Sequence, residues 1–352
     1  MDIKQLLQQT IDSGASDLHL LTGVPPTLRI DGVLVPLSNF GVMTKDAVSE
    51  LVSQVLTSEQ LSKISVDKEL DFSLPFSDKA RFRGNIYTQK GSLAVSFRRI
   101  PLEIPGIDSL GLPPIIHSFT NLRQGLVLVT GPTGHGKSTT LASILNEINA
   151  NRLCHIVTIE DPIEFVFRSQ KSIVSQREMN SDTHSWQVAL RSVLREDPDV
   201  VLVGEMRDYE TISAALTVAE TGHLVFATLH TNSAAQTVDR IVDVFPEEQQ
   251  KQVRLQLSNV IEAVFSQRLV SAVPKGRVVA YELMLGTNAV KTAIREGKTH
   301  LIDSILETSH EAGMITLEKT LAGLVKGGKI TLDSAQGWSL RPELLSRLVR
   351  SG

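Results

Sequence analysis

Residues 125–139 read GLVLVTGPTGHGKST, and this stretch decides the fold. Its first six residues form a mostly apolar strand of the kind found in parallel sheets. The remainder satisfies the pattern G-x-x-x-x-G-K-[ST] and runs directly into a predicted helix over 141–149, which is the context that a phosphate-binding loop requires. The glycines let the backbone wrap closely around phosphate oxygens, and the loop N–H groups with the helix N-terminus form an anion cradle.

The phosphate loop predicts the ligand as well as the site. Lys137 is placed to reach the β- and γ-phosphates of a nucleotide, and the Ser138 hydroxyl is placed to ligate Mg²⁺. The sequence therefore predicts ATP and Mg²⁺ as the bound species. The predicted nucleotide-binding residues of this loop are Gly131, Pro132, Thr133, Gly134, His135, Gly136, Lys137, Ser138 and Thr139.

Further apolar runs lie at 156–159, 200–203, 224–228 and 278–284, with helical segments between them. Strands that alternate with helices predict a doubly wound α/β core, which we place at 119–285. Residues 1–100 contain short strand-like runs together with helical segments, a pattern that predicts a small α+β domain. The proline- and glycine-rich stretch 101–118 is typical of a linker. The pattern from 286 to 352 is helical, so we predict a helical extension there.

Acidic residues follow two of the predicted strands. Residues 159–165 read IEDPIEF, and a carboxylate at this place can orient or deprotonate an attacking water. The spacing does not choose between Glu160, Asp161 and Glu164. Residues 199–205 read DVVLVGE, a Walker B-like apolar strand, and its terminal Glu205 is predicted to act on metal-bound water. The predicted metal-site residues are thus Ser138 and Glu205.

Two histidines flank the predicted strand 224–228 in the stretch TGHLVFATLHTN, residues 221–232. His223 opens the strand and His230 closes it. The end of a strand beside a phosphate loop is a position that resembles that of a γ-phosphate sensor. We therefore predict that both histidines are functional.

The composition excludes several classes of protein. The net charge is −4 and aromatic residues make up 5%, which argues against nucleic-acid binding. The one cysteine, Cys154, excludes an internal disulfide, and no Cys/His cluster has zinc spacing. Residues 1–20 lack the pattern of a signal peptide, and no apolar run approaches the ~20 residues that span a bilayer. We therefore expect any membrane role to go through a partner.

The four motifs, in this order, resemble those of the PilT family of secretion-type ATPases. The resemblance continues through AAQTVDRIVDVFP at 234–246, and in the amino-terminal domain it rests on ASDLHL at 15–20, Pro25-Pro26, Arg29, Asp31-Gly32 and ARFR at 80–83. It thus spans about residues 1–285.

The resemblance implies a PAS-like domain at 1–100, a RecA-like ATPase core at 119–285, and a homo-hexamer with ATP between protomers. It implies that Glu164 is the general base, that Glu205 is the Walker B glutamate, and that both histidines form a histidine box. An interfacial site needs cations from a neighbouring copy to stabilise the transferring phosphoryl group. The residues that resemble such cross-domain arginines are Arg83 and Arg98, with Arg191, Arg195 and Arg240 as further candidates.

The single cysteine and the position of the small domain close to Met1 favour the short, retraction-type subfamily. The resemblance then implies a cytoplasmic motor at the inner membrane that drives pilus retraction and twitching motility, with an inner-membrane platform protein as partner and no direct contact with nucleic acid. The stretch AVKTAIREGK at 289–298 departs from the family's AIRNL-like segment. Two alternatives stay open: a protein- or DNA-secretion ATPase of the same superfamily, and a nucleotide-gated accessory pilus subunit with low turnover.

Overall fold

The computed structural model describes residues 1–30, 32–76, 80–101 and 103–351. The chain divides into two compact units, Met1–Glu103 and Ile104–Gly352. Asp31, which contributes to the family resemblance, lies outside the described residues.

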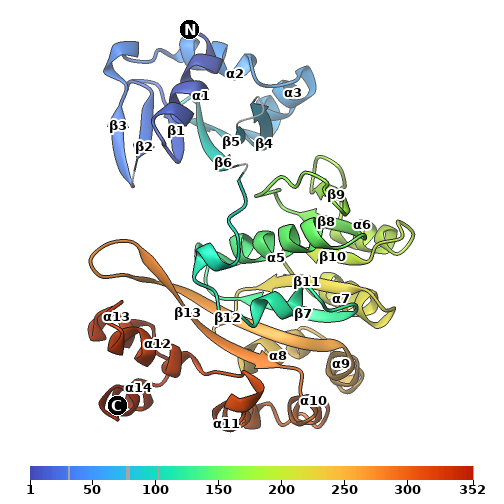
Figure 1. Ribbon diagram of the computed structural model, residues 1–352. Helices are drawn as coiled ribbons and strands as arrows, with labels where there is room; N and C mark the ends of the chain where they lie inside the picture. Colours follow the sequence, from blue (N-terminus) through green and yellow to red (C-terminus); the bar gives the residue numbers. More distant parts are fainter. Residues whose placement is uncertain (31, 77–79, 102, 352) are drawn as a thin grey trace. The chain divides into compact units, whose positions relative to one another are not determined.

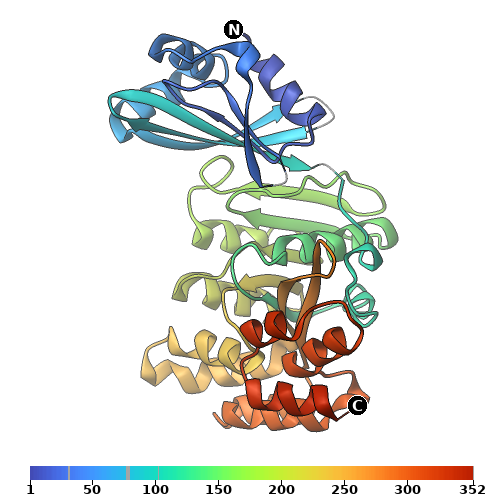
Figure 2. The same cartoon turned by 90° about the vertical axis from the view of Figure 1, so that its left-hand side faces the viewer.

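The first unit is an antiparallel sheet with helices on one face (Figure 2). Its strands follow the order β3-β2-β1-β6-β5-β4. Phe82, Phe97 and Leu18 are fully buried between the sheet and the helices. The elements are α1 (Ile3–Asp12), β1 (Asp17–Leu20), β2 (Thr27–Ile30), β3 (Val33–Pro36), η1 (Ser38–Phe40), α2 (Lys45–Ser53), α3 (Ser58–Asp67), β4 (Glu69–Phe76), β5 (Ala80–Gln89) and β6 (Ser92–Pro101).

The second unit is built on a seven-stranded sheet in the order β13-β12-β7-β11-β10-β8-β9 (Figure 1). All neighbouring pairs run parallel except β12 and β13, which pair antiparallel. The strands are β7 (Gly125–Thr130), β8 (His155–Glu160), β9 (Ile173–Glu178), β10 (Val200–Val203), β11 (Leu224–Leu229), β12 (Ile261–Ser271) and β13 (Arg277–Leu285).

The five apolar runs of the sequence correspond to β7, β8, β10, β11 and β13. The sequence patterns did not predict β9 or β12. Residues 247–260 form a helix that passes into β12 with Ile261 as both the helix cap and the first strand residue, so no turn signal separates the two elements. β9 is an edge strand with a partly exposed, polar pattern, and therefore lacks the apolar run of a central strand.

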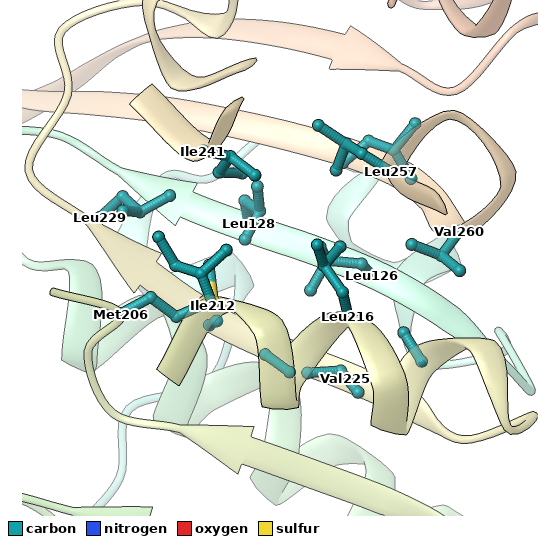
Figure 3. Packing of buried hydrophobic residues seen from close by; sticks show 14 of the residues in the cluster. Leu126, Leu128, Met206, Ile212, Leu216, Val225, Leu229, Ile241, Leu257 and Val260 are labelled. Carbon is teal, nitrogen blue, oxygen red and sulfur yellow. The ribbon is translucent and has the colours of Figure 1, made fainter. Parts of the chain in front are cut away.

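Helices cover both faces of the large sheet, which buries β7, β10 and β11 completely. On one face, Leu141 and Ile144 of the helix after the phosphate loop pack against Val127 and Phe226. On the other face, Leu128 meets Ile212, Ile241 and Leu257 from three different helices (Figure 3). These helices are α5 (Lys137–Asn151), α6 (Trp186–Val193), α7 (Tyr209–Glu220), α8 (Ala234–Asp243) and α9 (Glu247–Val260).

The predicted linker at 101–118 contains two short helical segments. They are η2 (Asp108–Leu110) and α4 (Ile116–Phe119), and both belong to the second unit. Ile107 and Ile116 are buried in the same cluster as Val127 of β7, so this stretch packs on the core of that unit.

The stretch 286–351 contains only helical elements. Among them, α12, α13 and α14 pack on the antiparallel pair β12 and β13 through a cluster that includes Val270, Ala280, Leu321 and Leu345 (Figures 1 and 2). The elements are α10 (Asn288–Arg295), η3 (Thr299–Leu301), α11 (Ile302–Thr308), η4 (His310–Ala312), α12 (Leu317–Lys326), α13 (Leu332–Trp338) and α14 (Pro342–Arg350).

Candidate functional site

The phosphate loop joins the C-terminal end of β7 to the N-terminus of α5, on the side of the sheet where the parallel strands end. Gly136 precedes the first helical residue, Lys137, and has a φ of 83°. Gly131 has a φ of 137°, and a Cβ atom at this position would collide with the carbonyl oxygen of Gln267. The loop therefore lies against β12 at a distance that only glycine permits.

Lys137 folds over this loop. Its Nζ donates hydrogen bonds to the carbonyl oxygens of Gly131 at 2.9 Å and Pro132 at 3.0 Å. Burial lowers the pKa of Lys137, while the carboxylates of Glu205 and Glu164 act in the opposite direction. The lysine is thus a buried cation at the phosphate loop, which is the charge that a bound triphosphate requires.

His230 connects the loop to the end of β10. Its Nδ1 lies 3.4 Å from Nζ of Lys137 and 3.3 Å from Oγ1 of Thr133, and its Nε2 lies 3.0 Å from Oε1 of Glu205. An ammonium group has only hydrogens to donate, so Nδ1 is the acceptor and Nε2–H donates to Glu205. Burial and the neighbouring Lys137 lower the pKa of His230. The imidazole is therefore neutral at pH 7.

Glu205 is held in its ionised form. Burial acts to raise its pKa, but the hydrogen bond from Arg207 and the positive charges of Arg207 and Lys137 lower it below its usual value. Arg207 Nη2 lies 2.7 Å from Oε2 of Glu205. One carboxylate oxygen thus faces the histidine and the other faces the arginine.

The three acids at the end of β8 and just after it lie in different environments. Glu160 is buried, accepts hydrogen bonds from Thr158 and Gln176, and has its pKa raised to about 7 by desolvation. Asp161 and Glu164 are exposed. The charge of Glu164 acts to raise the pKa of Lys137, so this carboxylate lies within electrostatic range of the phosphate loop.

His223 does not join His230. It precedes β11, whose six residues at ~3.3 Å each place the two histidines roughly 20 Å apart on opposite edges of the sheet. Its carbonyl oxygen accepts from the N–H of Gly125 at the start of β7, and its Nδ1 lies 3.0 Å from the Val218 carbonyl oxygen. Within one chain, His223 therefore has a structural role: its contacts connect the end of α7 to the start of β7.

The five candidate arginines are distributed over both units. Arg83 and Arg98 are direct cross-strand partners on β5 and β6 of the first unit, and both are exposed. Arg98 forms an ion pair with Asp17 at 2.8 Å. The other three are exposed in the second unit: Arg191 on α6, Arg195 just after it, and Arg240 on α8.

Gln267 is a site residue that the sequence reasoning missed. Its side chain donates from Nε2 to the carbonyl oxygen of His135 at 2.7 Å and accepts from Oγ1 of Thr140 at 2.8 Å. It therefore bridges the phosphate loop and the first turn of α5. The signal that could have found it is the tripeptide Ser266-Gln267-Arg268, three polar residues inside the otherwise apolar run 263–270.

The described parts of the chain contain no group of three or more His, Cys, Asp or Glu side chains arranged to hold a metal ion. Over the same residues, no helix is both long and apolar enough to cross a membrane.

The chain is similar to known proteins over most of its length. Residues 1–327 match the family described as "Type II/IV secretion system protein". The chain is 46% identical to the "Type IV pilus retractation ATPase PilT" of Pseudomonas aeruginosa, over 97% of this chain and 99% of that protein. It is 45% identical to a "Twitching motility protein" of Neisseria gonorrhoeae, over 91% of this chain and 86% of that one.

Among solved structures, the fold matches "Crystal Structure of the Pilus Retraction Motor PilT and Bound ADP" with a TM-score of 0.93 and 46% identity, over 99% of each chain. The predicted fold class is thereby confirmed: a small α+β unit precedes an α/β unit with the fold of a nucleotide-binding motor, and helices form its C-terminal part.

Proposed function

This chain belongs to the family of type II/IV secretion system proteins, and on that premise we propose that it hydrolyses ATP to power retraction of a type IV pilus. The observation that carries the proposal is the chain of contacts from Lys137 through His230 to Glu205. It joins the phosphate loop to a strand-end carboxylate, as ATP hydrolysis by a P-loop enzyme requires. The high identity to proteins named for pilus retraction and twitching supports the biological role.

The roles of the site residues follow from their places. The loop amides and Lys137 bind the phosphates, and His230 contacts the γ-phosphate end of the site. Glu164 is the general base, because it is exposed and its charge acts on Lys137. Glu160 is a poor base for a bound water since it is buried and already accepts two hydrogen bonds from side chains.

The residues present fit Mg²⁺. This ion keeps several waters and usually binds one or two protein oxygens together with substrate phosphates, so a dedicated cage of carboxylates is not required. Ser138 stands in the first turn of α5, directly after Lys137. Ser138 and the ionised Glu205 would hold the ion, which supplies charge stabilisation at the transferring phosphoryl group.

The active form that we propose is a homo-hexamer in the cytoplasm, at the inner face of the inner membrane. An inner-membrane platform protein of the pilus is its partner, and no nucleic acid is bound. Arg83 and Arg98 act on the site of a neighbouring copy, with Arg191, Arg195 and Arg240 as further cations. Both members of the first pair are exposed on one face of their sheet, which supports a role outside their own unit.

Phosphate release from ATP by the purified full chain tests the activity. Lys137→Ala removes the buried cation of the loop and should abolish turnover. Glu164→Gln should bind ATP but release at least about a hundredfold less phosphate, as expected for loss of a general base. Glu160→Gln is the matched control and should retain most of the rate. Normal hydrolysis by Glu164→Gln would place the base elsewhere.

Deletion of the gene tests the biological role. Loss of a retraction motor should leave cells with excess surface pili and no twitching motility. Cells that lack pili altogether would indicate an assembly motor, and unchanged piliation with a secretion defect would indicate a secretion ATPase. Lack of phosphate release by a chain that binds ATP would favour an accessory subunit.

A further inference from the structure

Arg268 of β12 is a buried cation that the proposed chemistry does not use. Arg268 is only 2% exposed. Burial lowers the pKa of its guanidinium, whereas the charges of Glu282 and Glu318 act to raise it. Its Nη2 donates to the carbonyl oxygen of Asn232 at 2.9 Å, while Nη1 is buried without a hydrogen-bond partner among the described residues. A buried arginine with an unsatisfied nitrogen is unfavourable for stability, so its presence calls for another reason.

The Asn232 carbonyl belongs to the short segment 230–234, which we call the histidine segment. It begins at His230, directly after β11, and ends at Ala234, the first residue of α8. The backbone N–H of Ala234 donates to Oε1 of Glu282 at 2.7 Å. The histidine segment is therefore tied to β12 at Asn232 and to β13 at Ala234, and α8 lies beside both strands (Figure 1).

The neighbouring carboxylates have hydrogen-bond partners of their own. Glu282 accepts from the backbone of α8, and Glu318 forms an ion pair with Arg341 at 3.2 Å. Among the described residues, the Asn232 carbonyl oxygen is the one acceptor to which Arg268 donates. The hydrogen bond of Arg268 is thus directed at the histidine segment and not at the carboxylates.

β12 therefore contacts both halves of the candidate site through adjacent residues. Gln267 bridges the phosphate loop, and Arg268, whose side chain points to the opposite face of the sheet, holds the histidine segment. We propose that Arg268 is a positioning residue: by fixing the Asn232 carbonyl it keeps His230 in register with the phosphate loop. The inference deepens the proposed function and rests on it.

The two adjacent residues should have different effects on nucleotide binding. ADP contacts the phosphate loop but lacks the γ-phosphate that His230 faces. Gln267→Ala should therefore weaken ADP and the non-hydrolysable analogue AMP-PNP alike. Arg268→Gln should leave ADP affinity within about twofold of wild type and reduce the preference for AMP-PNP over ADP in the presence of Mg²⁺. Because a misplaced group commonly slows catalysis by one to two orders of magnitude, it should also lower kcat about tenfold or more.

The experiment uses the full chain, with calorimetric titration of ADP and AMP-PNP and steady-state phosphate release. Arg254→Gln is the control, since Arg254 is half-buried on α9 and hydrogen bonds to Gln250. It should change neither the affinity ratio nor kcat. In a chain that already carries His230→Ala, adding Arg268→Gln should lower kcat no further, because the residue acts through the histidine.

Removal of Arg268 takes away one of the positive charges that act near the buried Glu282, so the single variant risks misfolding. The double variant Arg268→Gln with Glu282→Gln removes both charges and serves as the second test. A wild-type affinity ratio in a folded variant overturns the proposal, as does an equal further loss of kcat in the His230→Ala background. If neither variant keeps a native thermal transition, Arg268 serves stability alone and the proposal is rejected. A wild-type chain that binds both nucleotides but releases no phosphate would contradict the proposed function only, since the affinity ratio still reports on Arg268.

Discussion

Glutamates around the phosphate loop differ in protonation because their surroundings differ. Glu205 accepts a hydrogen bond from Arg207, and this bond together with the charges of Arg207 and Lys137 lowers its pKa. Glu160, at the end of the neighbouring strand β8, has no ion-pair partner among the residues that the structure describes, and burial raises its pKa to about 7. Burial also raises the pKa of Glu282, which lies next to α8, to about 7. Residue type alone therefore does not decide which of these groups is an anion at the site.

The raised pKa of Glu160 predicts a pH-dependent stability. The pKa is about 7 in the folded chain against 4.5 for the free side chain. The folded state thus binds the proton more tightly, and the stabilisation is fully present below pH 4.5 and lost as the pH rises through 7. From the size of the shift it amounts to roughly 3 kcal/mol. Measured by urea unfolding between pH 4.5 and 8, the wild type should lose this much relative to Glu160→Gln.

Asp161→Asn is the control for that comparison, since Asp161 is the adjacent exposed carboxylate. Its unfolding free energy should follow the wild type at every pH. A constant difference between wild type and Glu160→Gln across the range would show that Glu160 does not titrate near neutrality.

The neutral His230 predicts the acid limit of catalysis. Protonation would put a hydrogen on Nδ1 of His230, which faces the ammonium group of Lys137 at 3.4 Å. Nδ1 could then no longer accept a hydrogen bond from Lys137. Because burial and Lys137 lower the pKa of His230, kcat/KM should fall towards acid pH with a midpoint below pH 6.5. Initial rates of phosphate release at ATP concentrations well below KM measure this profile. His230→Gln should be slower throughout and should lack that inflection, whereas an inflection above pH 6.5 in the wild type would mean that the imidazolium is present at neutral pH.

At the scale of elements, the predictable parts were those whose pattern is local. The strand 125–130 and the loop that follows carry their signal in consecutive residues, and β7 begins and ends where the sequence indicated. β12 could not be predicted because α9 runs into it without a turn. The bonds of Gln267 and Arg268 to the two loops were missed with it, since they depend on the pairing of β12 with β7. The distance between His223 and His230 likewise follows from the direction of β11, not from their nearness in sequence.

The contact between the phosphate loop and β12 makes a prediction for two glycines. Gly131 and Gly134 both have positive φ, but only at Gly131 would a Cβ meet another atom, the carbonyl oxygen of Gln267. Both alanine variants carry backbone strain, and Gly131→Ala adds overpacking of about 1–3 kcal/mol. Thermal unfolding without nucleotide should show a clearly lower Tm for Gly131→Ala than for Gly134→Ala. Equal transitions would mean that β12 yields to the added methyl group.

At the scale of the whole molecule, the proposed ring assigns the phosphate loop and the arginines of one site to different copies. Lys137→Ala lacks the loop cation, and the double variant Arg83→Ala with Arg98→Ala lacks the arginines, so each alone should be nearly inactive. If the arginines act on a neighbour, an equal mixture of the two chains restores both parts at about one quarter of the interfaces of a randomly mixed ring. Phosphate release should then recover after subunits are mixed under conditions that allow exchange, and a chain with a cleavable tag verifies the exchange. Arginines that serve their own chain would give no recovery, because no chain in the mixture carries both parts. Mixing Arg240→Ala with Lys137→Ala then tests in the same way whether Arg240 of α8 acts on a neighbouring copy.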